Sequence, residues 1–169
     1  MVSRDIGVDR ELEKILDKIS RSLVKKTTLG NKKGVVVKKF KPIGKTKLVG
    51  PESKNGIYVY NKEEKLWELV IVDGNGFKPW KDGYYVIYFD NTRCPACRIY
   101  DLSWYVYIET IGRTLDNTEF VIILCNWFSG DCDSEAASKS FKEYGIKASP
   151  TTVLLEVRNG EIVRRENIR

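Results

Sequence analysis

The sequence contains no histidine, no glutamine and only one methionine, whereas lysine and glutamate are abundant. This composition is typical of heat-adapted proteins, so we expect a thermophile as the source. No apolar run approaches the roughly 20 residues that a membrane-spanning helix needs. Residues 1–5 include charged side chains and lack the apolar stretch of a secretion signal. A cytoplasmic protein without a membrane span is therefore expected.

The chain also lacks internal repeats and low-complexity tracts. Its 169 residues, of which 42% are hydrophobic, suffice for one core with or without a small additional module. The net charge of +6 is unevenly distributed: residues 1–80 contain 18 Lys and Arg against 10 Asp and Glu, and residues 81–169 contain 11 against 13. We therefore expect two different surfaces and place a domain boundary between residues 80 and 81.

Residues 1–80 are predicted to form an extension that packs on the main domain. Residues 8–24 have apolar side chains at spacings of three and four, which predicts an amphipathic helix. Residues 25–47 contain nine lysines and no acidic residue, and they predict a basic loop with one short strand at Val35–Val37. Two β-type runs within residues 57–72 flank a polar segment, so an antiparallel hairpin is expected there.

Residues 81–169 alternate between strand and helix patterns. The expected strands are 84–90, 119–125, 151–157 and 161–165, and the expected helices are 95–115 and 134–144. The first two strands have continuous apolar runs joined through a helix, which is typical of buried parallel neighbours. An α/β fold with a central mixed sheet is therefore predicted.

Cys94 and Cys97 enclose Pro95-Ala96, directly after the first of these strands and at the start of the next helix. Thiols at positions i and i+3 of a first helical turn share a face and can close a small disulfide ring. The unpaired N–H groups of a helix N-terminus favour a thiolate. The motif therefore predicts dithiol redox chemistry. Half of a zinc site, a structural disulfide and unused thiols are the alternatives.

A second motif, Ser149-Pro150-Thr151, precedes the third strand, and Asn159-Gly160 follows that strand. With the Cys-x-x-Cys junction, this order of motifs and elements resembles the thioredoxin family over about residues 84–165. The resemblance implies a thioredoxin-like three-layer fold and a cis peptide bond before Pro150, beside the dithiol. It also implies that the Ser149 backbone offers hydrogen bonds to an extended peptide or thiol substrate.

The resemblance implies a role for each site residue. Cys94, which precedes the helix and is the more exposed of the pair in this geometry, attacks a substrate disulfide, and Cys97 resolves the mixed disulfide. The catalytic set is Cys94, Cys97 and Pro150, and the substrate-binding set is Arg93, Pro95, Ala96, Ser149 and Thr151. We expect Arg93 and Arg98 to add to thiolate stabilisation, and we expect no metal and no cofactor.

The chain departs from the thioredoxin pattern at several positions. Arg93 replaces the usual Trp, and the proline directly after the nucleophile is closer to glutaredoxins and to more oxidising disulfide-exchange proteins. Tyr88 replaces the buried Asp that lies six residues upstream of the nucleophile in thioredoxins. We interpret Asp90, at the strand end, as a solvated loop carboxylate. These departures leave the direction of electron flow open.

The thioredoxin pattern normally ends with a helix after the last strand, and only residues 166–169 remain here. One face of the sheet would then be uncovered. Exposed apolar surface costs about 25 cal/mol per Å2, so we expect the helix at residues 8–24 to cover that face.

Cys125 and Cys132 form a second pair, at the end of strand 119–125 and in the loop that follows it. Loops at this end of an α/β sheet lie near the turn that contains Cys94 and Cys97. The pair is either a second disulfide that relays electrons or regulates access, or a structural feature: a stapled loop, or one buried and one free thiol. We favour the structural interpretation. The unequal spacing of the two pairs argues against zinc bound by all four thiols.

Three aromatic residues have two possible roles. Trp104, Trp127 and Phe128 could line a substrate groove, and we favour core positions for them. The basic segment could bind phosphate, but it has no interleaved aromatic residues and no known nucleic-acid-binding motif. We interpret it as a solvated loop.

The predicted function is that of a thiol–disulfide oxidoreductase that acts on protein substrates and exchanges electrons with a redox partner. The alternative is a redox-inactive binding or adaptor module that uses the same scaffold and its basic N-terminal region, since a fold alone does not determine activity.

Overall fold

The computed structural model describes residues 14, 17, 18 and 40–168, and the chain divides into two compact units, residues 1–38 and 39–169. Lys14, Asp17 and Lys18 are helical, within the helix predicted at residues 8–24. The remainder of that helix, the cover that we predict it supplies, and the basic segment up to residue 39 lie outside the described residues. The second unit includes the predicted hairpin, so it begins well before the predicted boundary at residue 80.

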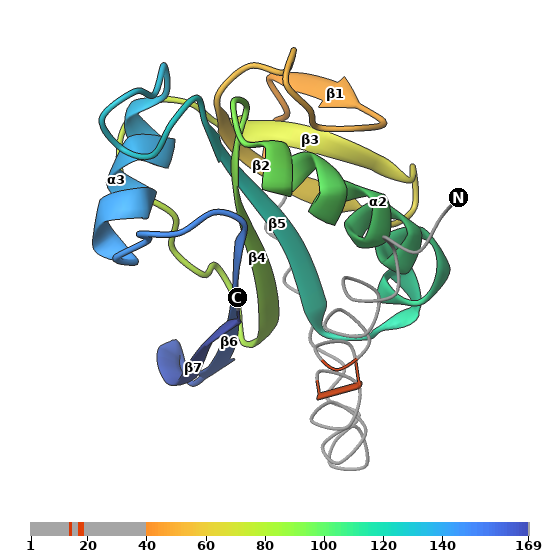
Figure 1. Cartoon of the computed structure of the whole chain (residues 1–169). Coiled ribbons are helices and arrows are strands. Elements are labelled where there is room, and N and C mark those ends of the chain that lie inside the picture. The colour runs from red at the N-terminus through yellow and green to blue at the C-terminus, as the bar shows by residue number, and fades with distance from the viewer. Residues whose placement is uncertain (1–13, 15–16, 19–39, 169) are drawn as a thin grey trace. The chain divides into compact units, whose positions relative to one another are not determined.

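The second unit contains one seven-stranded mixed sheet, with the strand order β1-β3-β2-β5-β4-β6-β7 (Figure 1). Strands β4 and β5 are parallel, and the other neighbouring strands are antiparallel. The strands are β1 (Gly44–Thr46), β2 (Gly56–Asn61), β3 (Leu66–Ile71), β4 (Gly83–Asn91), β5 (Thr118–Cys125), β6 (Thr151–Arg158) and β7 (Glu161–Ile168).

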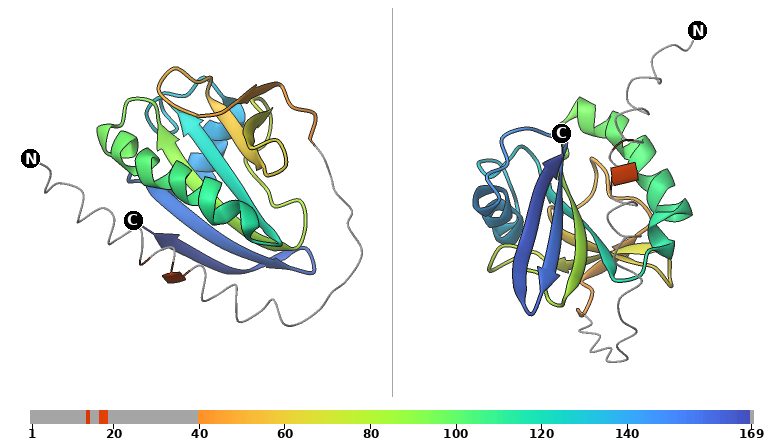
Figure 2. Two further views of the ribbon diagram at one scale, coloured as in Figure 1. Left: turned by 90° about the vertical axis from the view of Figure 1, so that its right-hand side faces the viewer. Right: turned by 90° about the horizontal axis from the view of Figure 1, so that it is seen from below.

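Two helices connect the central strands and cover opposite faces of the sheet (Figure 2). Helix α2 (Pro95–Thr110) follows β4 and is succeeded by a 3-10 turn, Gly112–Thr114, and α3 (Glu135–Glu143) follows β5. The α/β fold class, the mixed sheet and both helices of the second unit are confirmed. Among residues 14, 17, 18 and 40–168, no helix is long and apolar enough to cross a membrane.

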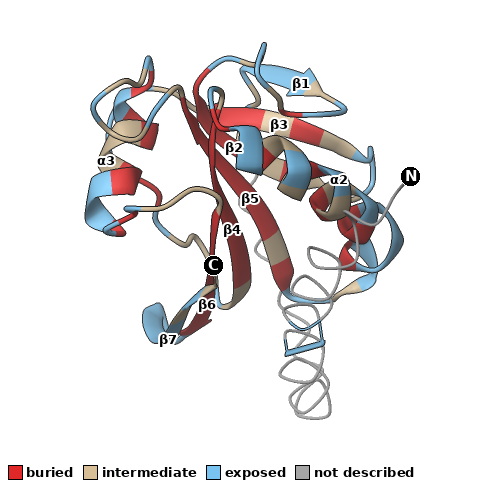
Figure 3. Cartoon of the chain, in the orientation of Figure 1, coloured by how far each residue is buried: buried red, intermediate tan, exposed pale blue. Residues whose placement is uncertain are grey.

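Successive side chains of a strand point to opposite faces of the sheet, and Figure 3 shows β4 buried along most of its length, so both faces of this strand are covered. Phe89 packs edge-on against Phe141 of α3, with ring centroids 5.1 Å apart. On the other face Tyr88 packs against Trp104 of α2, at 5.2 Å. Burial on both sides explains why this strand and β5 have uninterrupted apolar sequences rather than alternating ones.

The predicted hairpin forms as β2 and β3, and its β2 side joins the edge of β5 in antiparallel orientation. Ile57 of β2 lies opposite Ile123 of β5, and both are fully buried. The hairpin is therefore part of the same sheet as β4 and β5, the strands that lead to the two cysteine pairs. The three-residue strand β1 was not predicted, because its sequence Gly-Lys-Thr has no apolar pattern.

Trp104 is predicted to be a main stabilising residue of the α2 face. It is 3% exposed and lies among the rings of Trp67, Tyr88 and Phe120. We expect Trp104→Ala to lower the free energy of unfolding by about 3–5 kcal/mol, because it removes a large buried side chain and leaves a cavity. Chemical denaturation of the oxidised protein measures the change.

The matched control is Val106→Ala, on the exposed side of the same helix. We expect it to change the free energy of unfolding by no more than about 0.5 kcal/mol. Equal effects of the two substitutions would contradict a core position for Trp104.

Candidate functional site

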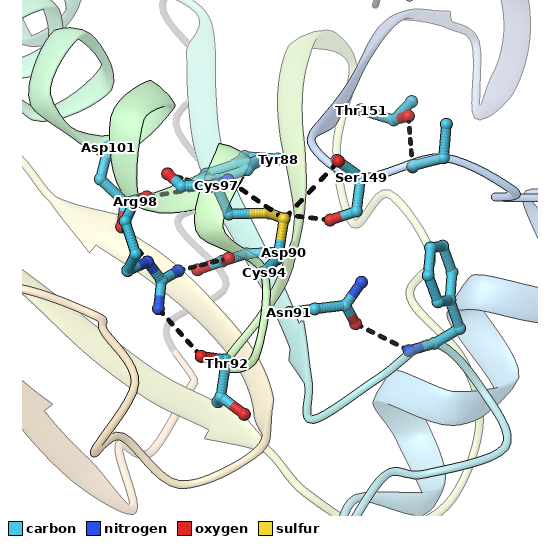
Figure 4. The surroundings of a disulfide bond; sticks show 12 residues. Tyr88, Asp90, Asn91, Thr92, Cys94, Cys97, Arg98, Asp101, Ser149 and Thr151 are labelled. Atoms are coloured by element: carbon cyan, nitrogen blue, oxygen red, sulfur yellow. Dashed lines mark hydrogen bonds and ion pairs between the residues drawn. A yellow bond between two sulfur atoms is a disulfide. The ribbon is translucent and has the colours of Figure 1, made fainter.

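Cys94 and Cys97 form a disulfide at the N-terminus of α2, with a Cα–Cα distance of 5.2 Å (Figure 4). Cys94 is the N-cap residue, and its Sγ accepts a hydrogen bond from the Cys97 backbone N–H at 3.1 Å. Pro95 lies in the first turn, where its missing N–H leaves no donor unpaired. The unpaired N–H groups at a helix N-terminus favour negative charge on a sulfur at this position.

Ser149 lies against this disulfide, although it is 52 residues from Cys97 in sequence. Its Oγ is 2.8 Å from Cys97 Sγ, and its carbonyl oxygen is 3.6 Å from Cys94 Sγ. A sulfur in a disulfide has no proton to donate, so the Ser149 hydroxyl is the donor to Cys97 in this state. The carbonyl can accept a hydrogen bond from Cys94 only when that residue is a thiol.

The pairing of β4 with β6 brings the two segments together. Phe89 lies opposite Thr151, so the residues just before β6 reach the turn that follows β4. The Ser149–Pro150 peptide bond is cis, as predicted.

The predicted substrate-binding residues differ in their exposure. Arg93, Pro95 and Ala96 are exposed beside the disulfide, and Ser149 is half-buried. Thr151 is buried, and its hydroxyl donates to the Ala148 carbonyl at 2.7 Å, so that hydroxyl is already engaged within the chain.

Within the pair itself, Cys94 is 4% exposed and Cys97 is fully buried. This order agrees with the expected one, because the residue that we assign as the nucleophile is the more accessible of the two.

Both arginines that flank the pair have carboxylate partners. The Arg98 guanidinium forms ion pairs with the carboxyl groups of Asp90, at 2.6 Å, and of Asp101, at 2.9 Å (Figure 4). Arg93 forms an ion pair with Asp131, in the loop after β5. Neither guanidinium is therefore held against a cysteine sulfur by these contacts, in contrast to the role that we expect for them from sequence.

Our interpretation of Asp90 as a solvated carboxylate is wrong, because Asp90 is completely buried. Burial, and secondarily the nearby Asp101 carboxylate, raise the pKa of Asp90 to about 8, while the Arg98 guanidinium opposes the shift. The sequence does contain a signal for this burial. Asp90 directly follows the apolar run of β4, and it lies two residues after Tyr88, so both side chains are on the face of the strand that α2 covers.

Tyr88 links this buried polar cluster to the cysteine pair. Its hydroxyl donates to Asp101 at 2.8 Å and also lies 3.2 Å from the Cys97 carbonyl oxygen. Burial raises the pKa of both the Tyr88 hydroxyl and the Asp101 carboxyl above their ordinary values. Sequence reasoning missed Asp101, although its position four residues after Cys97 on one helix could have identified it.

Cys125 and Cys132 also form a disulfide, with a Cα–Cα distance of 4.6 Å. All four cysteines are paired, so no free thiol remains in this state. Among the described residues, no cluster of histidine, cysteine and carboxylate side chains could hold a metal ion. Of the interpretations weighed for the second pair, one buried and one free thiol is wrong.

The three aromatic candidates lie in different environments. Trp104 is a core residue. Phe128 packs against the core through Phe141, with ring centroids 5.9 Å apart. Trp127 is 48% exposed, in the loop that the second disulfide closes, so our preference for a core position is wrong for this residue.

Comparisons of the chain with protein-family models, with curated proteins and with solved structures find no match. The function is therefore inferred from the residues and the geometry of this chain alone.

The burial of Asp90 predicts a pH dependence of stability. Between the ordinary carboxyl pKa of 3.8 and about 8, the folded protein holds a proton on Asp90 that the unfolded chain releases. The stability contributed by this protonation is full below about pH 4, declines as pH rises and is lost above about pH 8. Asp90→Asn removes the titration, so we expect the variant to gain stability relative to the wild type as pH rises through this range.

Urea unfolding at several pH values between 4 and about 8.5 measures this difference. The control is Asp116→Asn, an exposed carboxylate before β5, which we expect to change stability little at any of these pH values. A constant difference between Asp90→Asn and wild type across the range would contradict proton binding by Asp90.

Proposed function

We propose that the protein is a thiol–disulfide oxidoreductase that exchanges disulfides with protein substrates through Cys94 and Cys97. The observation that carries the proposal is a disulfide at a helix N-terminus with Ser149 against both sulfur atoms. The helix end favours the thiolate form of Cys94, and the cyclic disulfide gives Cys97 the position from which it resolves a mixed disulfide.

The order of elements supports a thioredoxin-like arrangement of residues 84–165. A parallel pair, β4 and β5, is connected through α2, and β6 lies antiparallel beside β4, with Ser149 and Pro150 at its start. Strand β7 completes this side of the sheet. This is the order that the family resemblance implies, and β2 and β3 extend the sheet beyond β5.

Exchange proceeds by attack of a thiolate on a disulfide sulfur. In the oxidised protein, a thiolate of the partner attacks Cys94 Sγ, a disulfide forms between the two proteins and Cys97 leaves as a thiolate. A second partner thiolate then attacks the partner sulfur of the mixed disulfide and releases Cys94. Two electrons and two protons pass from the partner dithiol to the Cys94–Cys97 pair. The reverse sequence reduces a substrate disulfide.

The Ser149 hydroxyl has a direct role in this sequence. It lies 2.8 Å from Cys97 Sγ, the sulfur that leaves or attacks in each direction. Cys97 is fully buried, so its thiolate loses solvation by water. A hydrogen bond from Ser149 offsets part of that loss.

The surface next to the disulfide favours a polypeptide as the substrate. Pro95 and Ala96 are exposed. Ile99, Leu102 and Val106, which are 54%, 71% and 61% exposed, continue along α2 at the spacing of a helix face. An apolar strip of this kind beside the reacting sulfurs suits contact with a protein rather than with a small charged thiol.

Replacement of each cysteine tests the proposal. In an assay of insulin reduction by dithiothreitol, we expect the wild type to accelerate the reaction and Cys94→Ser to reduce the rate to the uncatalysed level. We expect Cys97→Ser to accumulate a mixed disulfide between Cys94 and the substrate, because the resolving thiol is absent. Mass spectrometry without reductant detects that adduct.

The control is Ser103→Ala, a half-buried position of α2 that is not part of the pair. We expect it to retain the wild-type rate. Acceleration that survives Cys94→Ser would contradict the role of this residue. A wild-type protein that neither accelerates insulin reduction nor exchanges with glutathione would favour the redox-inactive binding module instead.

A further inference from the structure

The second disulfide begins next to the segment that leads into the first one. Asn91, the last residue of β4, lies opposite Cys125, the last residue of β5. The Cys125–Cys132 bond therefore closes a loop, residues 126–131, that starts next to the segment leading into Cys94.

The loop is folded back on itself. The backbone N–H groups of Asn126 and Trp127 both donate to the Asp131 carbonyl, at 3.0 and 2.9 Å. Asp131 directly precedes Cys132, so the disulfide ties this end of the loop to the end of β5. The position of Asp131 is thus fixed both by hydrogen bonds and by a covalent bond.

Each of the three residues directly before Cys94 forms a hydrogen bond with this loop. The backbone N–H groups of two of these residues donate to carbonyls of Cys125 and of the loop. The contacts are Thr92 N–H to Cys125 O (2.9 Å), Arg93 N–H to Asn126 O (3.3 Å), Thr92 Oγ1 to Asn126 Oδ1 (3.0 Å) and Phe128 N–H to Asn91 Oδ1 (2.7 Å). Figure 4 shows the Asn91 side chain turned away from the Cys94–Cys97 pair and toward this last N–H.

The same loop supplies the carboxylate that pairs with Arg93, the charged residue directly before Cys94. The Arg93 guanidinium forms its ion pair with Asp131. Both side chains are well exposed, so this pair depends on the position of the loop rather than on burial.

We infer, on the basis of the proposed function, that the Cys125–Cys132 disulfide is a positioning element for the Cys94–Cys97 pair and makes that pair harder to reduce while it is intact. The second disulfide acts through three residues of the loop that it closes, Asn126, Phe128 and Asp131.

Two physical effects of opening the second disulfide have the same sign. First, a looser loop no longer holds residues 91–93, so the two thiols at Cys94 and Cys97 meet less often and their disulfide is less stable relative to the dithiol. Second, Asp131 is no longer fixed beside Arg93, so the guanidinium can stabilise a Cys94 thiolate. Both effects favour the reduced form of the first pair.

The second disulfide can be opened by a small thiol. Cys132 is half-buried, whereas Cys125 is fully buried, so attack at Cys132 Sγ is the accessible route. Two glutathione thiols supply two electrons and two protons, one molecule of glutathione disulfide forms, and Cys125 and Cys132 become thiols.

The test is an equilibrium measurement on the wild-type protein in glutathione buffers of varied ratio. Thiols are trapped by alkylation, and peptide mass spectrometry counts the four species: both pairs oxidised, each pair reduced alone, and both reduced. We expect the equilibrium constant for reduction of Cys94–Cys97 to be about tenfold larger when Cys125–Cys132 is open, which corresponds to about 30 mV. By linkage the second pair shows the same factor.

Two variants separate the causes. Cys125→Ser with Cys132→Ser is expected to reproduce the whole shift, whereas Asp131→Asn, with the second disulfide intact, reproduces the part due to Arg93. The control Asp116→Asn removes one exposed carboxylate at the opposite end of β5 and should leave the equilibrium constant unchanged. A double-cysteine variant that does not fold leaves the wild-type species count and Asp131→Asn to decide.

The outcomes separate the two proposals. If Cys94–Cys97 exchanges with glutathione with an equilibrium constant that is independent of the second pair, the positioning role is wrong and the proposed function stands. If Cys94–Cys97 does not exchange with glutathione at all, the proposed function is wrong, and the positioning role is wrong with it.

Discussion

The antiparallel pairing of β4 with β6 is the constraint on which the candidate site depends. The register that places Phe89 opposite Thr151 puts Ser149 against a disulfide that belongs to a segment more than fifty residues away. A slip of one residue would exchange the faces of β6 and move Ser149 along the strand direction. Because both faces of β4 are packed, one against α2 and the other against α3 and the buried side chains around it, this register is strongly specified by the core. The precision of the site is therefore a consequence of sheet packing.

The face of β4 under α2 also contains charge, which is costly to bury. Asp90 and Asp101 share one guanidinium, that of Arg98, so the cluster would carry a net negative charge if both acids were ionised. The raised pKa of Asp90, about 8, removes that imbalance at neutral pH, because one carboxylate then stays protonated. The Tyr88 hydroxyl lies within hydrogen-bond distance of both the Asp101 carboxyl and the Cys97 carbonyl oxygen. It therefore links the buried acids to the backbone of the disulfide. The cluster and the cysteine pair form one continuous region of the structure.

Much of this arrangement could be predicted from sequence, because local patterns carry it. Continuous apolar runs identified β4 and β5 as buried parallel neighbours, and Cys-Pro-Ala-Cys located the start of α2. The sequence did not indicate that β2 would join β5, because strand partners are chosen by the whole sheet. Asp90 was misassigned because a terminal carboxylate in a strand is usually solvated, and its burial depends on Arg98 and Asp101 of the next helix. The contacts of the loop that Cys132 closes are also invisible in the sequence, since they join residues that have no periodic relation.

The proposed redox activity requires that the N-terminus of α2 favours the thiolate form of Cys94. The most direct test is the pH dependence of alkylation in Cys97→Ser protein with the second disulfide oxidised, where Cys94 is the one free thiol. The N–H groups at the start of α2 stabilise the thiolate, so we expect the pKa of Cys94 to lie below the ordinary cysteine value of about 8.5. A Cys94 thiol that titrates at or above about 8.5 would contradict it.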